Sequence, residues 1–314
     1  MATPRLLNLG KAFALLLPLG LAVAFVATGV VAPDYRTYIA MVTDRTSPDF
    51  VGYLYAYWFL PVFQFLSLLP LPAGYLIWSA CNIAGVWWGA RVFKGNAIIA
   101  LLSYQMFTVL WYGNITGIVI GALAVMAWSL QRDRAVVAGL AWAVAATKLQ
   151  LGLPLGLAIW LLGGRHPRAL LTLLVVVVAS LALYPGWPLE MIGMMGLSNT
   201  LGSVSLWQWI GPLSLLLWLR LPRTLIGITA TLALTSPYFQ QGDLLMLLVL
   251  PVGWLGLLAN VGFLYVVYGW DALKLPVVFP AAVYVRDIIS SLRDRMLRAN
   301  TMPLHSVLML ILRP

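Results

Sequence analysis

Long apolar runs separated by short polar clusters dominate the chain. Residues 12–32 carry no charged side chain, and Arg5 and Lys11 precede them. A run of this length without a clear A-x-A cleavage site predicts a membrane-anchoring helix with a cytoplasmic N-terminus, rather than a cleaved signal peptide. The next stretch, residues 33–52, holds five charged side chains and is predicted to be a loop outside the membrane.

Five basic clusters separate the later apolar runs. Because Lys and Arg gather in the cytoplasmic loops of membrane proteins, all five are predicted on the cytoplasmic side, with an even number of crossings between neighbouring clusters. The clusters are Arg91 with Lys94, residues 132–134, residues 165–168, Arg220 with Arg223, and residues 286–298.

Pairs of apolar segments fill most of the intervals between these clusters. Each pair is predicted to form two helices joined by an extracytoplasmic turn or loop, because the backbone must satisfy its own hydrogen bonds within a bilayer. The pairs are 96–112 with 115–130, 135–147 with 151–162, 170–184 with 205–219, and 225–237 with the segment from 244 onward.

One interval does not fit this count. Residues 54–69 and 74–89 are both apolar, yet only one of them can cross if Arg91 is cytoplasmic. We interpret residues 54–69, which are rich in Tyr and Phe and end at Pro70-Leu71-Pro72, as an interfacial or re-entrant segment.

Several predicted helices are shorter than the roughly 20 residues that a crossing normally needs. The segment 135–147 has only 13 residues. Such helices either thin the bilayer or end at a cavity buried within the protein. The second arrangement suits a membrane enzyme with a site near the outer leaflet, and it also suits a transporter.

Composition supports a membrane protein. Of 314 residues, 62% are apolar and 9% are charged, and the mean hydropathy is +0.94. Soluble domains carry about 25% charged residues, so these values exclude a soluble enzyme and a disordered chain. The single cysteine, Cys81, excludes a disulfide framework. The net charge of +10 indicates loops that face anionic membrane lipid rather than nucleic acid.

These patterns together predict an all-α polytopic membrane protein. Its transmembrane domain would cover residues 1–283, including an extracytoplasmic loop over residues 33–53. Residues 284–314 would form a cytoplasmic basic amphipathic helix and tail, because apolar side chains recur at helical spacing among arginines between Arg286 and Arg298.

The polar side chains outside the basic clusters fall on the predicted extracytoplasmic side. Asp34 follows the first apolar run directly, where partial desolvation would raise its pKa toward the range of a general base. The alternative is a solvated aspartate paired with Arg36.

Lys148 interrupts a long apolar stretch. A lysine at membrane depth costs about 2.5–3.5 kcal/mol on insertion scales, so it usually faces a cavity or a partner. One hypothesis is a cation for a lipid phosphate, and the other is a lysine that extends to the outer headgroups. Asp243 is either a second carboxylate of the same site or a helix N-cap.

Spacings typical of metal sites and nucleotide-binding motifs are absent from the sequence. No metal or other cofactor is therefore predicted.

Several motifs resemble those of a known enzyme family. Asp34-Tyr35, residues 55–63 (YAYWFLPVF) and residues 68–72 (LLPLP) are similar to the D…Y…YPPLF…PL opening of glycosyltransferase family 87, a mannosyltransferase-like family of the GT-C superfamily. Residues 112–116 (YGNIT) fall where the family has G-Q-x-N. Residues 138–148, followed by Arg165 and Arg168, resemble its AGLLLGLAAALK…RR block, and residues 236–251 resemble its SP…Y…LLLP segment.

The resemblance covers roughly residues 33–251 and implies an enzyme. It implies a GT-C-like bundle of roughly 9–11 transmembrane helices in the cell membrane, with the active face extracytoplasmic. The activity would be inverting transfer of mannose, or another hexose or pentose, from a polyprenyl-phosphate donor to an extracytoplasmic lipid, glycan or protein.

The resemblance also implies roles for single residues. Asp34 maps onto the family's catalytic base, and Lys148 maps onto the lysine that would hold the donor phosphate. The other residues expected to bind substrate are Tyr35, Arg36, Asn114, Gln240 and Asp243.

Two alternatives stay open. The chain departs from the family's pattern at Asn114, where the family has Gln, at Thr116, where it has Asn, and at Leu151, where it has Pro. These departures favour a catalytically inactive relative that serves as a structural subunit of a larger membrane complex. Lys148 and Asp243 in apolar surroundings would also suit a transporter, although the sequence shows no strong internal repeat.

Overall fold

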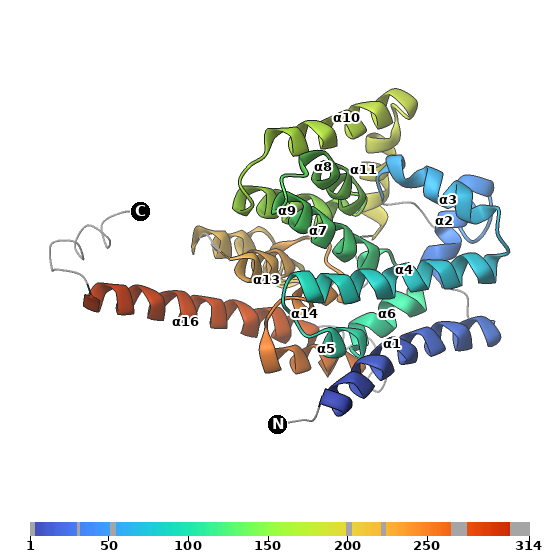
Figure 1. Cartoon of the computed structure of the whole chain (residues 1–314). Helices are drawn as coiled ribbons and strands as arrows, with labels where there is room; N and C mark the ends of the chain where they lie inside the picture. Colours follow the sequence, from blue (N-terminus) through green and yellow to red (C-terminus); the bar gives the residue numbers. More distant parts are fainter. Residues whose placement is uncertain are drawn as a thin grey trace.

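The computed structural model describes residues 4–29, 32–50, 55–198, 203–220, 224–264 and 275–301 (Figure 1). Within these ranges the secondary structure is helical, apart from one isolated antiparallel bridge between Ser203 and Gln240. The all-α prediction is therefore confirmed for the described part of the chain.

The described residues up to position 183 form ten α-helices and one short 3-10 helix. In chain order they are α1 Pro4–Ala27, α2 Pro33–Thr43, η1 Tyr57–Phe59, α3 Leu60–Ser67, α4 Leu71–Val92, α5 Ala97–Leu101, α6 Tyr104–Tyr112, α7 Thr116–Leu130, α8 Ala135–Ala145, α9 Leu149–Leu162 and α10 Pro167–Leu183.

The second half is more irregular, with 3-10 segments between α-helices. In chain order the elements are α11 Trp187–Ser198, α12 Trp207–Ile210, η2 Gly211–Arg220, α13 Leu225–Thr235, η3 Gln241–Leu244, α14 Leu245–Leu248, η4 Gly253–Phe263 and α16 Val278–Thr301. Figure 1 shows α16 extending away from the body formed by the other helices.

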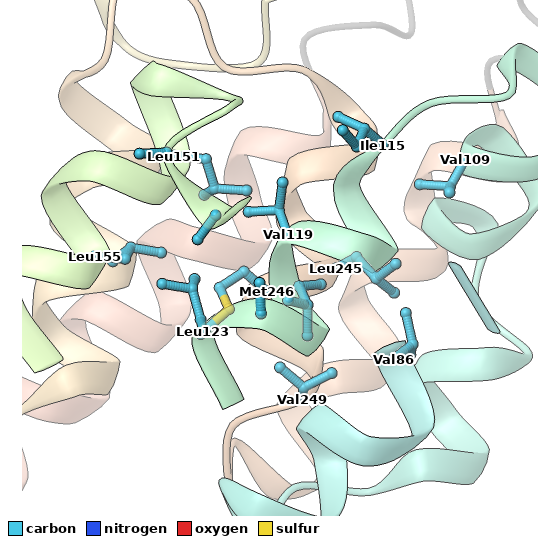
Figure 2. Close-up of a cluster of buried hydrophobic side chains, with 14 of the residues drawn as sticks. Val86, Val109, Ile115, Val119, Leu123, Leu151, Leu155, Leu245, Met246 and Val249 are labelled. Carbon is cyan, nitrogen blue, oxygen red and sulfur yellow. The ribbon is translucent and has the colours of Figure 1, made fainter. Parts of the chain in front are cut away.

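Helix α7 lies at the centre of the fold. Ten of its fifteen residues are buried, and α4, α6, α9 and α14 contribute side chains to the same apolar cluster. Figure 2 shows this cluster, with Val119 and Leu123 of α7 close to side chains from the surrounding helices. The buried residues of the four neighbouring helices that the figure labels are Val86, Val109, Leu151, Leu155, Leu245 and Met246.

Glycines allow α4 and α7 to approach each other closely. A methyl group added at Gly85 would overlap the backbone carbonyl of Gly117, and one added at Gly121 would lie 2.7 Å from the Cα of Gly85. The two backbones are therefore in direct contact, which fixes where α7 begins relative to α4.

The outside of the bundle is strongly apolar. Phe13 and Leu16 of α1 and Leu171, Val175 and Val178 of α10 are each more than half exposed. Soluble monomers rarely expose apolar patches this continuous, whereas a lipid-facing surface requires them. The helices thus present the kind of surface expected of a membrane protein.

Within the described ranges, two helical segments are long and apolar enough to cross a membrane, Gly10–Ala27 and Leu275–Asp294. The number rises to four if the bent pairs α6 with α7 and α10 with α11 are each counted as one span. These counts are lower than the nine to eleven crossings implied by the resemblance, because α8, α9, α13 and η4 have only 11 to 14 residues each.

Helix positions agree closely with the sequence prediction where apolar runs are bounded by charged or turn residues. Helices α7, α8, α9 and α13 begin and end within two residues of the predicted bounds. Residues 96–112 differ because they divide into α5 and α6, where the Ser103 hydroxyl accepts a hydrogen bond from the backbone of Met106 and starts a new helix.

The segments predicted to lie outside the membrane core are partly helical in the structure. Residues 33–53, predicted as a loop, contain α2. Helix α3 has eight residues and is too short to cross a bilayer, as expected of an interfacial or re-entrant segment. The predicted boundary at residues 283 and 284 falls inside α16, which continues to Thr301, and the tail from residue 302 lies outside the described residues.

The close contact between α4 and α7 can be tested by replacing glycine with alanine. We expect Gly85→Ala to lower the stability of the purified protein by about 1–3 kcal/mol, because the new methyl group has no space. Gly20→Ala in α1 is the matched control, since no atom in the described part of the chain, apart from the neighbouring residues and backbone of α1 itself, lies within 4 Å of the added methyl group. Thermal unfolding in detergent measures both variants, and equal melting temperatures would contradict the proposed close packing.

Candidate functional site

Helix starts from four parts of the chain meet at one cluster of polar side chains. Asp34 lies in the first turn of α2, Thr116 is the first residue of α7, Lys148 directly precedes α9, and Asp243 belongs to η3. Asn114 lies in the break between α6 and α7, where the chain bends by 113°. Helix N-termini carry partial positive charge, so this arrangement suits carboxylates and other anions.

Gly113 brings α2 against the break between α6 and α7. It ends α6 in a left-handed conformation, with φ of +67°, which glycine adopts without steric cost. A methyl group at Gly113 would lie 2.7 Å from the Cβ atoms of Ala32 and Tyr35. The absence of a side chain here therefore allows Asp34 to approach Asn114.

Lys148 and Asp243 form a fully buried ion pair. Both residues have 0% exposure, and Lys148 Nζ lies 2.5 Å from Asp243 Oδ1. The same ammonium group donates to Asn114 Oδ1 at 3.1 Å and to Thr116 Oγ1 at 3.0 Å. Since a lysine ammonium has three donors, these three acceptors satisfy it completely.

Asn114 joins this ion pair to Asp34. Its Oδ1 accepts from Lys148 and from the backbone N–H of Thr116. Its Nδ2 donates to Asp34 Oδ2 at 2.8 Å and lies 3.3 Å from Gln240 Oε1. One amide thus connects the buried cation to a carboxylate nearer the surface.

Asp34 differs from the ion pair because it is partly exposed. Desolvation by burial raises the pKa of Asp34 from 3.8 to about 6, and the charge of Asp243 adds to this effect. The hydrogen bond from Asn114 and the charge of Lys148 act in the opposite direction. A carboxyl group with a pKa near the working pH can accept a proton and release it again, as a general base must.

Tyrosine hydroxyls lie around the carboxylates. Burial, together with the nearby charges of Asp34 and Asp243, raises the pKa values of Tyr55 and Tyr238 above their ordinary value. Gln240 Nε2 donates to the Tyr238 hydroxyl, and the hydroxyls of Tyr38 and Tyr55 are 2.9 Å apart. Neutral hydroxyls at this position can bind the hydroxyl groups of a polar substrate.

The structure brings five of the seven predicted site residues together. They are Asp34, Asn114, Lys148, Gln240 and Asp243. Asp243 is part of this cluster because its Oδ1 contacts Lys148, but the N-cap prediction is wrong in position. Gln240 is the N-cap of η3, and Asp243 is the third helical residue, whose Oδ2 accepts a hydrogen bond from the backbone N–H of Gln240 at 3.2 Å in a capping box.

The other two predicted residues lie outside this cluster. The ring of Tyr35 is fully buried against Tyr75 and Trp78, with centroid distances of 5.9 and 6.1 Å. Arg36 contacts Asp49 at 3.7 Å and both side chains are partly exposed, so the predicted partner Asp34 is replaced by a residue later in the same loop. Successive residues of α2 point in different directions, which separates these neighbours of Asp34.

Thr116, Tyr55 and Tyr238 belong to the cluster but were not assigned a role from the sequence. Thr116 has a recognisable signal, since it follows Asn114 by two residues at a helix start. Tyr55 and Tyr238 are two of thirteen tyrosines, and most tyrosines of a membrane protein lie in interfacial belts. Among the described residues, no group of three or more His, Cys, Asp or Glu side chains is placed to hold a metal ion.

Comparisons with protein families, with curated proteins and with solved structures find no match to this chain.

The buried ion pair predicts strongly non-additive effects on stability. We expect Lys148→Met to cost about 3–5 kcal/mol, because it leaves Asp243 charged and unpaired in an apolar interior. Adding Asp243→Asn should restore most of this loss, since the double variant buries no net charge. Unfolding of the purified variants in detergent measures the cycle. Arg36→Met, which removes one side of a partly exposed pair, is the control and should cost about 1 kcal/mol or less.

The raised pKa of Asp34 predicts a pH dependence of stability. Because the folded protein binds a proton more tightly than the unfolded chain, stability should fall as the pH rises from 3.8 to about 6. Asp34→Asn removes this loss, so its melting temperature relative to that of the wild type should increase between pH 4 and pH 7. A constant difference over that range would contradict the raised pKa.

Proposed function

We propose that the protein is an inverting glycosyltransferase of the GT-C type that uses a polyprenyl-phosphate-sugar donor. The observation that carries the proposal is the position of Asp34, a partly exposed carboxylate with a pKa raised to about 6 at the meeting point of broken apolar helices. In membrane proteins, irregular backbone within apolar surroundings occurs where it lines a cavity or is buried in protein.

In the proposed reaction Asp34 accepts the proton of an acceptor hydroxyl group. The acceptor oxygen attacks the anomeric carbon of the sugar, and the bond from that carbon to the phosphate oxygen breaks with inversion. Polyprenyl phosphate leaves with the electron pair of the broken bond. Gln240 is hydrogen-bonded to Asn114, and Tyr238 to Gln240, while Tyr55 interacts electrostatically with Asp34. In the proposal these side chains bind sugar or acceptor hydroxyl groups.

The donor phosphate needs compensation of its negative charge. Lys148, implied as the phosphate ligand by the resemblance, already uses its three donors within the cluster. It would therefore have to release one of them to bind phosphate directly. The N-termini of α2, α7 and α9 point toward the same place and favour an anion without such a rearrangement.

An enzyme of this type would form a bundle of nine to eleven crossings in the cell membrane, with the polar cluster around Asp34 on the extracytoplasmic side. Short helices such as α8 and α9 would cross as parts of this bundle by ending at the polar site. The sugar would be mannose or another hexose or pentose, and the acceptor an extracytoplasmic lipid, glycan or protein. Anionic lipid would contact the basic turns, and the protein could belong to a larger membrane complex.

A second candidate is a catalytically inactive subunit of a membrane complex. The observation that favours it is the complete satisfaction of Lys148 within the protein, since such a cluster can hold helices together without any ligand. This alternative predicts stable co-purification with partner proteins and no turnover of a lipid-linked sugar.

The test of the transferase is a matched pair of aspartate substitutions. We expect Asp34→Asn to lower transfer from radiolabelled polyprenyl-phosphate mannose by about 100-fold or more, because the general base is lost. Asp49→Asn, in the same extramembrane segment but paired with Arg36, should retain activity. Turnover by purified Asp34→Asn at the wild-type rate would remove Asp34 from the role of base. Inactivity of the wild type toward lipid-linked hexoses and pentoses would favour the structural subunit.

A further inference from the structure

We propose that Asn114 is a positioning residue for Asp34 and that the buried Lys148–Asp243 pair acts on Asp34 by orienting the Asn114 amide. The assignment of Asp34 as catalytic base rests on the proposed function, whereas the positioning itself rests on the geometry of the cluster. Lys148 then has a different role from that of a phosphate ligand.

The surroundings of Asn114 permit only one orientation of its amide. Lys148 Nζ and the backbone N–H of Thr116 are donors without acceptor capacity, and both face Oδ1. Asp34 Oδ2 and Gln240 Oε1 are acceptors, and both face Nδ2. A flipped amide would place N–H groups against both donors and an oxygen against both acceptors, so four favourable contacts would become unfavourable.

This orientation determines how Asp34 is presented. Nδ2 of Asn114 holds Asp34 Oδ2 at 2.8 Å, which leaves Oδ1 as the oxygen that Asn114 does not occupy. The carboxylate is therefore held by one oxygen from the protein side, while its other oxygen can face an acceptor hydroxyl group. Such fixed geometry is what a general base requires before proton transfer.

The two members of the ion pair act on the charge of Asp34 in opposite directions. Lys148 favours the ionised carboxylate and Asp243 disfavours it, so the two electrostatic effects oppose each other. Tyr55 and Tyr238, from other segments, also interact electrostatically with Asp34, and Arg36, on the same helix, contacts Asp49 instead. The hydrogen bond from Asn114 to Asp34 is therefore the specific contact through which the Lys148–Asp243 pair can act on the Asp34 carboxylate.

The test follows protonation of Asp34 without any substrate. The full-length protein in detergent is treated with a hydrophobic carbodiimide, which labels protonated carboxyl groups, over a series of pH values. Mass spectrometry then measures labelling of the peptide that contains Asp34, and Asp34→Asn confirms the assignment.

We expect Asn114→Leu to raise the pH midpoint of Asp34 labelling by about one pH unit, since a hydrogen bond to the ionised form is lost. Asn114→Ser should shift it in the same direction with less disturbance of the fold. Asn82→Leu is the matched control. Asn82 is also a buried asparagine that bonds to backbone groups, Trp78 O and Ile118 N, between α4 and α7, and its loss should leave the midpoint unchanged.

The role of the ion pair is tested by combining variants. The double substitution Lys148→Met with Asp243→Asn should raise the pH midpoint of Asp34 labelling when Asn114 is present. The same double substitution should have no further effect on this midpoint when Asn114 is already replaced by Leu. An equal shift in both backgrounds would show that the pair acts directly through its charges, and an unshifted midpoint in both Asn114 variants would overturn the positioning role. Because no sugar transfer is measured, the result is independent of whether the transferase proposal survives.

Discussion

The buried ammonium group of Lys148 is the constraint on which the centre of this structure depends. A charged amine in an apolar interior is tolerated only when its donors are all satisfied. The three acceptors of Lys148 are side-chain oxygens rather than backbone carbonyls, which are bonded within the helices. The acceptors come from a helix break, Asn114 with Thr116, and from the 3-10 segment that carries Asp243.

Several of the central helices begin or end at this polar cluster. Helices α6, α8 and α13 stop where the polar cluster begins, and α7, α9 and α14 resume beyond it or next to it. The apolar cluster shown in Figure 2 packs side chains of α9 and α14 against α7. Length alone therefore identifies few complete spans, although α7, α8, α9 and α13 are each more apolar on average than α1.

Much of this arrangement can be predicted from the sequence. The basic clusters fix the order of apolar segments, and that order alone places Asp34, Asn114, Lys148, Gln240 and Asp243 on one side. The sequence does not show which face of α2 turns inward, so Tyr35 and Arg36 were expected beside Asp34 although one packs against α4 and the other pairs with Asp49. It also does not reveal that Asp243 neutralises Lys148, because 95 residues separate them and the contact depends on tertiary packing.

Exposure changes in a regular way along the bonded cluster, and this gradient limits where chemistry can occur. Lys148 and Asp243 have no exposed surface, Asn114 is 5% exposed, and Asp34 and Gln240 are partly exposed. A ligand that approaches from outside meets Asp34, Gln240 and Tyr238 before it can reach the ion pair. Asn114 lies at the middle of this gradient. Its amide provides one acceptor for the lysine and one donor for the aspartate. This side chain therefore connects the buried charges to the accessible carboxylate.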